Sequence, residues 1–439
     1  MKDFNVAILG CGTVGGGVAK ILLEINEELY NKTGRKIVLK YIVELFPKKV
    51  SKRFDIPLDF FCGSGNDLTQ KQAIDFIKKI NEDKEIDLIV ETIGGSDDNI
   101  LNITLEILKS KKHLVTANKA LLAEKEKIIF NTAIDNNVSI GYEAAVCGAI
   151  PIIKTIKESF TGDEIESISG IMNGTSNYIL SMMQNESISF KEALKLAQKN
   201  GYAEADPILD INGSDAGHKL ILVSKLAFGI NLSLNQLSIV GIDNINQNDL
   251  DFAKEMECKI KLICYAKKIN HKIYATVCPM MVKNNNFLSK VDGSTNAIRM
   301  VNKYSGEHFL IGKGAGSLET ASSIVADIIF IARYSDKIKN HLKSSNYEFF
   351  NAKYFIFPYN IIFETEDIPG ITGIITTAIG NHKINIDTVG HNRHNKHRAI
   401  FSIATMPCSL NSINNAIDEI KTKRPNVLLT EPKIIPILY

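Results

Sequence analysis

A turn rich in carboxylates, followed by a lysine, contains the residue types that ammonium binding and proton transfer require. Glu204, Asp206 and Asp210 lie in or just after the segment GYAEADP, and Asp215 and Lys219 follow them. A spacing of four residues places Asp215 and Lys219 on one face of a helix. On spacing alone, an exposed ion pair explains these two residues, and substrate chemistry is the alternative.

The surroundings of this pair favour chemistry. The predicted helix Ser214–Phe228 carries an apolar stripe next to the pair, so the pair borders buried surface. The carboxylates of the turn suit a substrate ammonium group. A hydride transfer to an aldehyde needs a proton donor at the developing alkoxide, and a lysine near a carboxylate can serve. Lys119, which follows a predicted strand, is the other candidate cation.

A glycine-rich turn near the N-terminus predicts dinucleotide binding. Gly10, Gly12 and Gly15 form the pattern GxGxxG between an apolar strand, Phe4–Leu9, and a helix with an apolar face. The glycines permit a tight turn and close approach of the backbone, and the start of the helix attracts a pyrophosphate. A purely structural turn is the alternative, but its place at the head of a strand–helix series favours the cofactor.

The choice between NAD and NADP stays open. Glu44 follows the second predicted strand, Ile37–Val43, where a carboxylate would bind the ribose 2′-hydroxyl of NAD. It stands 29 residues after Gly15, against about 20 in the usual pattern, and a polar insert absorbs the difference. Four basic residues follow: Lys48, Lys49, Lys52 and Arg53. They would either hold the 2′-phosphate of NADP or form a solvent-exposed basic segment without a ligand.

The elements that position these residues alternate between strands and helices. After the first two strands, apolar runs at 86–91 and at His113–Thr116 flank a predicted helix at 99–110. This alternation predicts an α/β protein with a Rossmann-like, doubly wound parallel sheet. The segments ETIGG and TANK follow two of the strands, and ligands of such sheets bind at those carboxyl ends.

Three domains are predicted along the chain. Residues 1–150 form the dinucleotide-binding domain, to which 306–333 return through the segment GKGAG. Residues 151–305 form a mixed α/β domain for catalysis and dimerisation, and 334–351 form a linker. The last part, 352–439, has the predicted order βαββαβ and is expected to be a small independent domain.

The composition excludes several classes of protein. The chain has 439 residues, of which 45% are hydrophobic and 23% charged, and a formal net charge of +2. These values are ordinary for a globular protein and give no argument for binding to nucleic acid or a membrane. No apolar run approaches the ~18 residues of a membrane span, and no signal peptide is indicated. The seven cysteines form no CxxC pair, so we expect reduced thiols in a cytoplasmic enzyme.

Longer motifs resemble those of homoserine dehydrogenases with a C-terminal ACT domain. They occur in the family's order over residues 4–333: GCGTVGGGV, ETIGG, VTANKALLA, YEAAVCGAIPI, GIMNGTSNYIL, GYAEADPILDINGSDAGHKL and GKGAGSLETASSIVADI. The segments DIPG and KINID in the last part resemble an ACT module. The resemblance implies NAD(P)-dependent interconversion of L-aspartate 4-semialdehyde and L-homoserine, within threonine and methionine synthesis, by a homodimer or homotetramer.

The resemblance also implies roles for single residues. Lys219 is the expected proton donor, and Lys119 is expected to contact cofactor and substrate. The residues expected to bind substrate are Glu204, Asp210 and Asp215. Those expected against the dinucleotide, beyond the glycines, are Thr13, Val14, Thr92, Gly201 and Gly316. A monovalent cation, usually sodium, would be held by oxygen atoms of Glu143, Val146, Gly148 and Ile150.

The chain departs from the family at the second strand and adds a candidate effector site. Val43-Glu44 stands where the family commonly has Arg-Asp, so the arginine contact to a 2′-phosphate is missing. In the ACT-like part, an end-product amino acid, threonine, is expected to bind at a paired interface and to lower activity. A module that only dimerises the chain is the alternative. The residues expected to bind the effector are Asp367, Gly370, Asn385 and Asp387.

Two other functions compete with this interpretation. Another nicotinamide-dependent dehydrogenase of an amino-acid derivative would need a different substrate pocket, and the intact Glu204, Asp215 and Lys219 argue against it. A non-catalytic amino-acid sensor would be favoured by loss of the lysine or of the glycines, and neither is lost.

Overall fold

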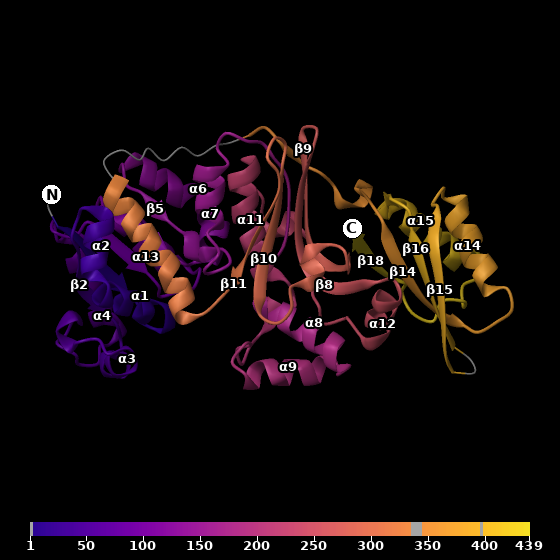
Figure 1. Ribbon diagram of the computed structural model, residues 1–439, viewed down its shortest axis with the longest axis horizontal. Helices are drawn as coiled ribbons and strands as arrows, with labels where there is room; N and C mark the ends of the chain where they lie inside the picture. Colours follow the sequence, from indigo (N-terminus) through magenta and orange to yellow (C-terminus); the bar gives the residue numbers. More distant parts are fainter. Residues whose placement is uncertain (1–2, 335–344, 396–397) are drawn as a thin grey trace. The chain divides into compact units, whose positions relative to one another are not determined.

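The computed structural model describes residues 3–334, 345–395 and 398–439, and leaves out the side chains of Lys32 and of residues 391–395. Two compact units are distinguished (Figure 1). The first comprises Met1–Ile165, His218–Ser233 and Leu310–Ser345, and the second comprises Glu166–Gly217, Leu234–Phe309 and Asn346–Tyr439. The predicted three-domain boundaries stay a prediction, and most of the predicted linker lies outside the described residues.

A five-stranded parallel sheet forms the core of the first unit, in the order β2-β1-β3-β4-β5. Its strands are β1 Phe4–Leu9, β2 Ile37–Val43, β3 Leu88–Glu91, β4 His113–Thr116 and β5 Ile140–Gly141. β1 and β3 are buried along their whole length, as expected of parallel strands. The helices of this unit include α1 Thr13–Glu24, α2 Asn26–Thr33, α3 Pro47–Phe54, α4 Gln70–Glu82, α5 Asp98–Lys109, α6 Lys119–Asp135, α7 Ile152–Lys154 and α13 Ser317–Tyr334. The predicted Rossmann-like sheet is confirmed.

α13 belongs to the first unit although it begins 304 residues after the start of α1. A Cβ at Gly17 of α1 would lie 2.9 Å from the carbonyl oxygen of Ser317, so glycine at this position lets the two helices approach closely. The Ser317 hydroxyl donates a hydrogen bond to the carbonyl of Thr13. The start of α13 therefore lies next to the start of α1.

A sheet of eleven strands runs through the second unit in the order β11-β10-β6-β8-β9-β18-β14-β16-β15, with β12 and β7 also paired to β9. β8, Cys258–Ile269, and β9, Lys272–Lys283, form a long antiparallel hairpin that extends beyond the predicted strand 272–277. The other strands outside the C-terminal part are β6 Ile165–Ile171, β7 Ser238–Ile239, β10 Thr295–Asn302, β11 Gly306–Lys313 and β12 Glu348–Phe349. The helices are α8 Gly174–Glu186, α9 Phe190–Lys199, α10 Ile208–Ile211 and α12 Gln247–Glu255, while α11, Ser214–Phe228, continues into the first unit.

The C-terminal part has the predicted order βαββαβ and shares a sheet with the rest of the second unit. Its elements are β14 Tyr359–Glu366, α14 Ile371–Asn381, β15 Ile386–Asn395, β16 Arg398–Thr405, α15 Leu410–Lys423 and β18 Lys433–Leu438, with a short β13–β17 pair at Ile356–Phe357 and Cys408–Ser409. β18 pairs with β14 on one side and with β9 on the other. One hydrophobic cluster contains Tyr274 of β9 together with Phe363 of β14. β18 thus joins the C-terminal part and the rest of the second unit in one continuous sheet, and the predicted separate domain stays a prediction.

Each of the seven cysteines is free. Within 3–334, 345–395 and 398–439, no group of three or more His, Cys, Asp or Glu residues is arranged to hold a metal ion. No helix in the described part of the chain has the length and apolar character that a membrane crossing demands.

Candidate active site

The glycine-rich turn between β1 and α1 forms a cradle for a dinucleotide. Gly10 has a φ of +78°, and a Cβ at Gly15 would lie 2.2 Å from the carbonyl oxygen of Gly10. A Cβ at Gly12, in contrast, would meet nothing within 4 Å, and Gly12 precedes α1 without a capping side chain. The first N–H groups of a helix lack partners within it. The open space at the start of α1 therefore suits a pyrophosphate.

Glu44 lies next to this turn, as predicted from its place after β2. Its carboxylate accepts hydrogen bonds from the N–H of Cys11 at 2.8 Å and from the N–H of Phe46 at 3.1 Å. Burial raises the pKa of the Cys11 thiol to about 12, and the charge of Glu44 adds to this shift. Both oxygens of Glu44 already accept backbone N–H groups, and each keeps a lone pair for a ribose hydroxyl.

The four cations after Glu44 lie on α3. Lys48, Lys49 and Lys52 are exposed. Arg53 is exposed as well, but its Nη1 donates to the Thr13 hydroxyl at 3.4 Å, and its guanidinium lies 5.0 Å from the centre of the Phe54 ring. Arg53 therefore contacts the first residue of α1, while the three lysines form an exposed basic face of α3.

A buried carboxylate joins the two loops that follow β3 and β4. Glu91 is 1% exposed and accepts two backbone N–H groups of the ETIGG loop and the Thr116 hydroxyl, the last at 2.7 Å. Asn118 donates to the carbonyl of Gly95 at 2.6 Å and caps α6, which begins at Lys119. Neither Glu91 nor Asn118 was predicted to have a role. The sequence feature that points to Glu91 is its position as a carboxylate at the end of an apolar strand.

Other predicted cofactor residues of the first unit surround the same turn. The Thr92 hydroxyl donates to the carbonyl of Gly10 at 2.6 Å. Gly316 directly precedes Ser317, whose hydroxyl bonds to Thr13. Gly201 belongs to the second unit, where it follows α9 with a φ of +75° and its N–H donates to the carbonyl of Gln198. Its local geometry is that of a helix C-terminus, and its role at the cofactor stays a prediction.

In the second unit, Asn173 joins two of the predicted carboxylates. Its side-chain amide donates to Asp210 at 2.6 Å and to Asp215 at 2.8 Å. Asn173 and Asp215 are buried and Asp210 is half-buried. Glu204 and Asp206, in contrast, are exposed. The structure therefore brings Asp210 and Asp215 together, leaves Glu204 on the exposed turn, and adds Asn173, which the sequence analysis missed.

Asp215 and Lys219 lie one turn apart on α11, which has the predicted bounds. The side chains are 7% and 8% exposed, respectively. This burial argues against the exposed ion pair that spacing alone would suggest. The division between the two compact units falls within this helix, between Gly217 and His218.

The candidate cation turn starts at a buried glutamate. The Glu143 carboxylate accepts the N–H groups of Ile153 at 2.7 Å and Lys154 at 2.9 Å. Burial raises the pKa of Glu143 to about 7, and the charge of Asp327 adds to this shift. The carbonyl of Glu143 accepts the N–H of Val146 at 3.2 Å, and the carbonyl and the carboxylate oxygens each keep a lone pair for a cation.

The rest of this turn presents backbone oxygens. Cys147 and Gly148 have φ angles of +55° and +53°, so the chain reverses sharply there. The carbonyl of Gly148 accepts the Ser323 hydroxyl at 2.8 Å, and Val146 and Ile150 are buried. Carbonyl oxygens of this kind suit a hard monovalent cation.

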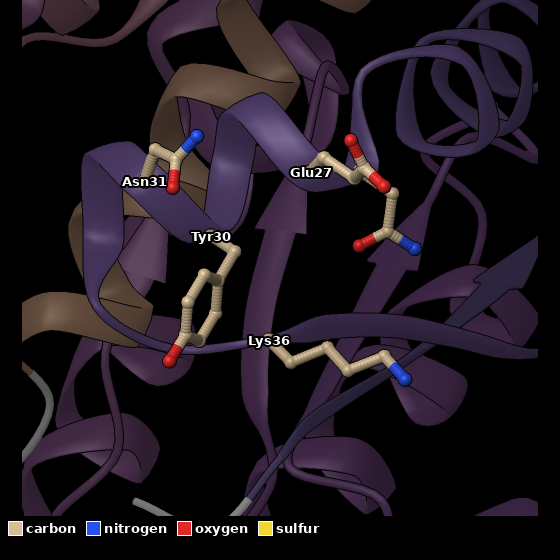
Figure 2. A pocket seen from close by; sticks show the side chains of 5 residues that line it. Glu27, Tyr30, Asn31 and Lys36 are labelled. Atoms are coloured by element: carbon tan, nitrogen blue, oxygen red, sulfur yellow. The ribbon is translucent and has the colours of Figure 1, made fainter.

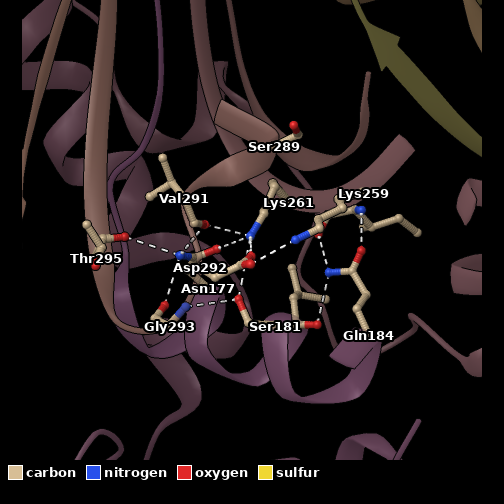
Figure 3. A network of polar contacts seen from close by, with 12 residues as sticks. Asn177, Ser181, Gln184, Lys259, Lys261, Ser289, Val291, Asp292, Gly293 and Thr295 are labelled. Atoms are coloured by element: carbon tan, nitrogen blue, oxygen red, sulfur yellow. Dashed lines mark hydrogen bonds and ion pairs between the residues drawn. The ribbon is translucent and has the colours of Figure 1, made fainter. Parts of the chain in front are cut away.

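A buried lysine anchors α8 in the second unit (Figure 3). The Lys261 side chain is 0% exposed, and its Nζ donates to the carbonyl of Val291 at 2.6 Å, to Asp292 at 2.8 Å and to Asn177 of α8 at 3.1 Å. Burial lowers the pKa of Lys261 to about 8, although Asp292 opposes the shift. Asn177 in turn donates to three carbonyls of the segment 291–295. α8 is thereby held to β8 and to this segment.

Each unit has a surface cavity among its described residues. One, of about 470 Å³, is lined by Lys36 and by the α2 residues Asn26, Glu27, Tyr30 and Asn31, and includes none of the predicted site residues (Figure 2). The other, of about 430 Å³, lies between α14 and α15. Its lining includes Gly370, Glu419, Lys423 and Arg424.

The predicted effector residues separate into two groups. β14 and β15 both pair antiparallel with β16, so they run in the same direction. Asp367 and Gly370 follow the end of β14, whereas Asn385 and Asp387 lie at the start of β15. Within one chain the two groups therefore lie at opposite ends of the strands, and their role as effector ligands at a paired interface stays a prediction.

The chain is similar to known proteins over most of its length. Residues 10–143 match the family described as homoserine dehydrogenase, NAD binding domain, and residues 151–329 match the one described as homoserine dehydrogenase. The homoserine dehydrogenase of Helicobacter pylori is 43% identical over 332 residues, which are 76% of this chain and 74% of that one. That of Neisseria gonorrhoeae is 36% identical over 399 residues, 89% of this chain and 88% of that one. A crystal structure of a homoserine dehydrogenase from Thiobacillus denitrificans matches with a TM-score of 0.89 at 31% identity, and covers 100% of this chain and 98% of that one.

Proposed function

Because the chain belongs to the homoserine dehydrogenase family, it is an NAD(P)-dependent oxidoreductase that interconverts L-aspartate 4-semialdehyde and L-homoserine, and we propose roles for its residues in that reaction. The observation that carries the proposal is the linked pair Asp210 and Asp215, which lies at the head of the helix that bears Lys219. An anionic pair next to a lysine suits a substrate with an ammonium group and a reacting oxygen.

The glycine-rich turn binds the cofactor, which exchanges a hydride with the substrate when bound. The space next to Gly12 accommodates the pyrophosphate at the start of α1. Further contacts are proposed for Thr13, Val14, Thr92, Lys119, Gly201 and Gly316. Glu91 and Asn118 support them by fixing the loops after β3 and β4.

Lys219 donates a proton to the substrate oxygen as the semialdehyde is reduced, and takes it back in the reverse direction. Asp215, one helical turn away, keeps the amine charged and oriented before the transfer. Lys119, at the start of α6, is the alternative donor. Asp210, Asp215 and Glu204 receive the substrate ammonium group.

The turn from Glu143 to Ile150 holds a monovalent cation, proposed to be sodium. Support comes from the backbone oxygens of Glu143, Val146, Gly148 and Ile150 and from the reversal of the chain at Cys147 and Gly148. A cation there would fix this turn and the elements packed on it.

The preference between NAD and NADP depends on Glu44 and Arg53. Glu44 favours a ribose hydroxyl and repels a phosphate, while Arg53, which contacts Thr13, is the cation best placed to hold a 2′-phosphate. Arg53→Ala should raise the KM for NADPH more than the KM for NADH if Arg53 binds the phosphate. Equal effects on both cofactors would remove Arg53 from this role.

The C-terminal part is proposed to be an ACT module that binds threonine between two copies of the chain. β15 ends the strand order of the sheet. Antiparallel pairing of β15 with that of a second copy would bring the two separated groups of effector residues together. We also propose a cytoplasmic homodimer or homotetramer.

A spectrophotometric assay of the purified chain tests the function. The purified chain should oxidise NADH or NADPH in the presence of L-aspartate 4-semialdehyde, and reduce NAD or NADP in the presence of L-homoserine. Absence of turnover with both cofactors in both directions would contradict the function.

A further inference from the structure

The side chain of Asn173 makes hydrogen bonds in three directions from a buried position. Its Oδ1 accepts the N–H of Ser176 at 2.8 Å, which caps α8. Its Nδ2 uses its two hydrogens for Asp210 at 2.6 Å and Asp215 at 2.8 Å. The side chain is 4% exposed. One neutral amide therefore links the start of α8 to two carboxylates that follow 37 and 42 residues later.

A neutral donor between two carboxylates has a specific electrostatic effect. Two carboxylates that share one site repel each other, and one of them then tends to take up a proton. Hydrogen bonds to the charged forms oppose this tendency without cancelling the negative charge. A lysine or arginine in the same place would neutralise one carboxylate. Asn173 therefore links the two carboxylates without bringing a positive charge between them.

The amide is held on a rigid support. Asn177, one turn further along α8, donates to the carbonyls of the segment 291–295, and Lys261 donates to Asn177 (Figure 3). A Cβ at Gly174 would lie 2.7 Å from the carbonyl oxygen of Ser294, so the start of α8 lies directly against this segment. The Ser176 hydroxyl donates to the carbonyl of Asp210 at 2.6 Å. α8 thus fixes both the backbone and the carboxylate of Asp210.

We propose that Asn173 is a positioning residue that sets the separation and charge of the Asp210–Asp215 pair, and thereby the affinity for the ammonium group of the substrate. This inference rests on the proposed role of these carboxylates in substrate binding. Asn173 does not touch the reacting atoms. It acts through Asp210 and Asp215, so its loss weakens substrate binding more than it weakens the binding of the cofactor.

Two substitutions separate the capping role of Asn173 from its link to the carboxylates. Asn173→Asp keeps the size and the capping oxygen, since Asp and Asn cap helices equally well, but replaces the donor by a third carboxylate. Asn173→Ser also keeps a capping oxygen, and its single, shorter hydroxyl replaces the amide whose two N–H groups reach both carboxylates, without adding charge. For both, the KM for L-homoserine should rise on the order of 10- to 100-fold, the range for lost hydrogen bonds to charged groups. The KM for the cofactor should change less than about 2-fold.

Asn246→Ala is the matched control. Asn246 caps α12 in the same unit through the N–H of Asp249, and its loss should lower the melting temperature but leave both KM values unchanged. If Asn173 only stabilised the fold, its substitution would instead change kcat, both KM values and the melting temperature together.

The outcomes distinguish this inference from the proposed function. If the wild-type enzyme turns over homoserine and both Asn173→Asp and Asn173→Ser keep the wild-type KM for it, the proposed role of Asn173 is overturned and the proposed function stands. Wild type that neither turns over homoserine nor releases heat with it in calorimetry would overturn the substrate site and this inference together. Calorimetric loss of homoserine binding in both variants, with cofactor binding retained, is the expected result.

Discussion

Lys219 is the residue whose removal should affect chemistry most directly. Lys219→Ala should lower kcat by roughly 10²- to 10⁴-fold, the usual contribution of a general acid, while the KM for the cofactor stays nearly unchanged. Stopped-flow measurement of hydride transfer checks this expectation. Lys225→Ala on the same helix is the control: Lys225 bonds to Asn231 and approaches Glu126, so its loss should reduce stability but not kcat. A Lys219→Ala enzyme with near wild-type turnover would transfer the role to Lys119.

Lys261 should make the stability of the fold depend on pH in the alkaline range. Its pKa is about 8 in the folded chain, against 10.5 for the ordinary side chain. Between these values the unfolded chain binds a proton that the folded chain does not, so the free energy of unfolding rises with pH by up to about 1.4 kcal/mol per unit. Relative to Lys261→Met, wild type should therefore gain stability from pH 8 to pH 10 in urea denaturation. A constant or falling difference would mean that the amine stays charged in the folded chain.

At the scale of elements, substitutions at two glycines of the glycine-rich turn should affect different properties. One should weaken cofactor binding, and the other should destabilise the fold. A Cβ at Gly12 would meet no atom within 4 Å, so the methyl group of Gly12→Ala displaces no part of the protein. The methyl group occupies the place proposed for the pyrophosphate, so the KM for NADH and for NADPH should rise at least about 10-fold. Initial-rate measurements over a range of concentrations of each cofactor measure this change.

Gly15→Ala is the contrasting variant of the same turn. Its Cβ would lie 2.2 Å from the carbonyl oxygen of Gly10, so the turn must shift and the melting temperature should fall by several degrees. If Gly12→Ala binds both cofactors like wild type, the pyrophosphate does not lie at the start of α1.

At the scale of the whole molecule, threonine should bind between copies of the chain and lower activity. Asn385→Ala should weaken threonine inhibition, because Asn385 is a proposed threonine ligand. The fold should tolerate the change, because Asn385 is exposed at the start of β15, away from the shared core. Thr388→Ala, exposed on the same strand, is the control. Activity titrations with threonine, with the mass of the assembly followed by analytical ultracentrifugation, give both readouts.

Two results would contradict this regulation. Activity that does not change at millimolar threonine would reject threonine as the effector. Equal inhibition of wild type and Asn385→Ala would place its site elsewhere. Removal of the C-terminal part is a poor test, because β18 pairs with β9 and the two parts share one hydrophobic cluster.

Local patterns in the sequence were sufficient for the elements and for the family. The strand Phe4–Leu9, the glycine turn after it and the helix Ser214–Phe228 have the predicted bounds, because apolar periodicity and glycine spacing act over a few residues. The long motifs implied the family to which the chain belongs. The pairing of β18 with β9 was not predictable in this way, because a strand's pattern does not identify which edge it will join.

The sequence by itself determined which residue types could carry the chemistry, and the tertiary structure decided which of them meet. Glu204, Asp206 and Asp210 are neighbours in the sequence, yet Asp210 is held with Asp215 while Glu204 is exposed. The residue that joins the pair, Asn173, lies 37 residues before Asp210 on another element. Helix and turn preferences arise from contacts within a few residues, whereas the burial of a side chain and its hydrogen bonds depend on how distant segments pack. For that reason the carboxylates were predictable and their common partner was not.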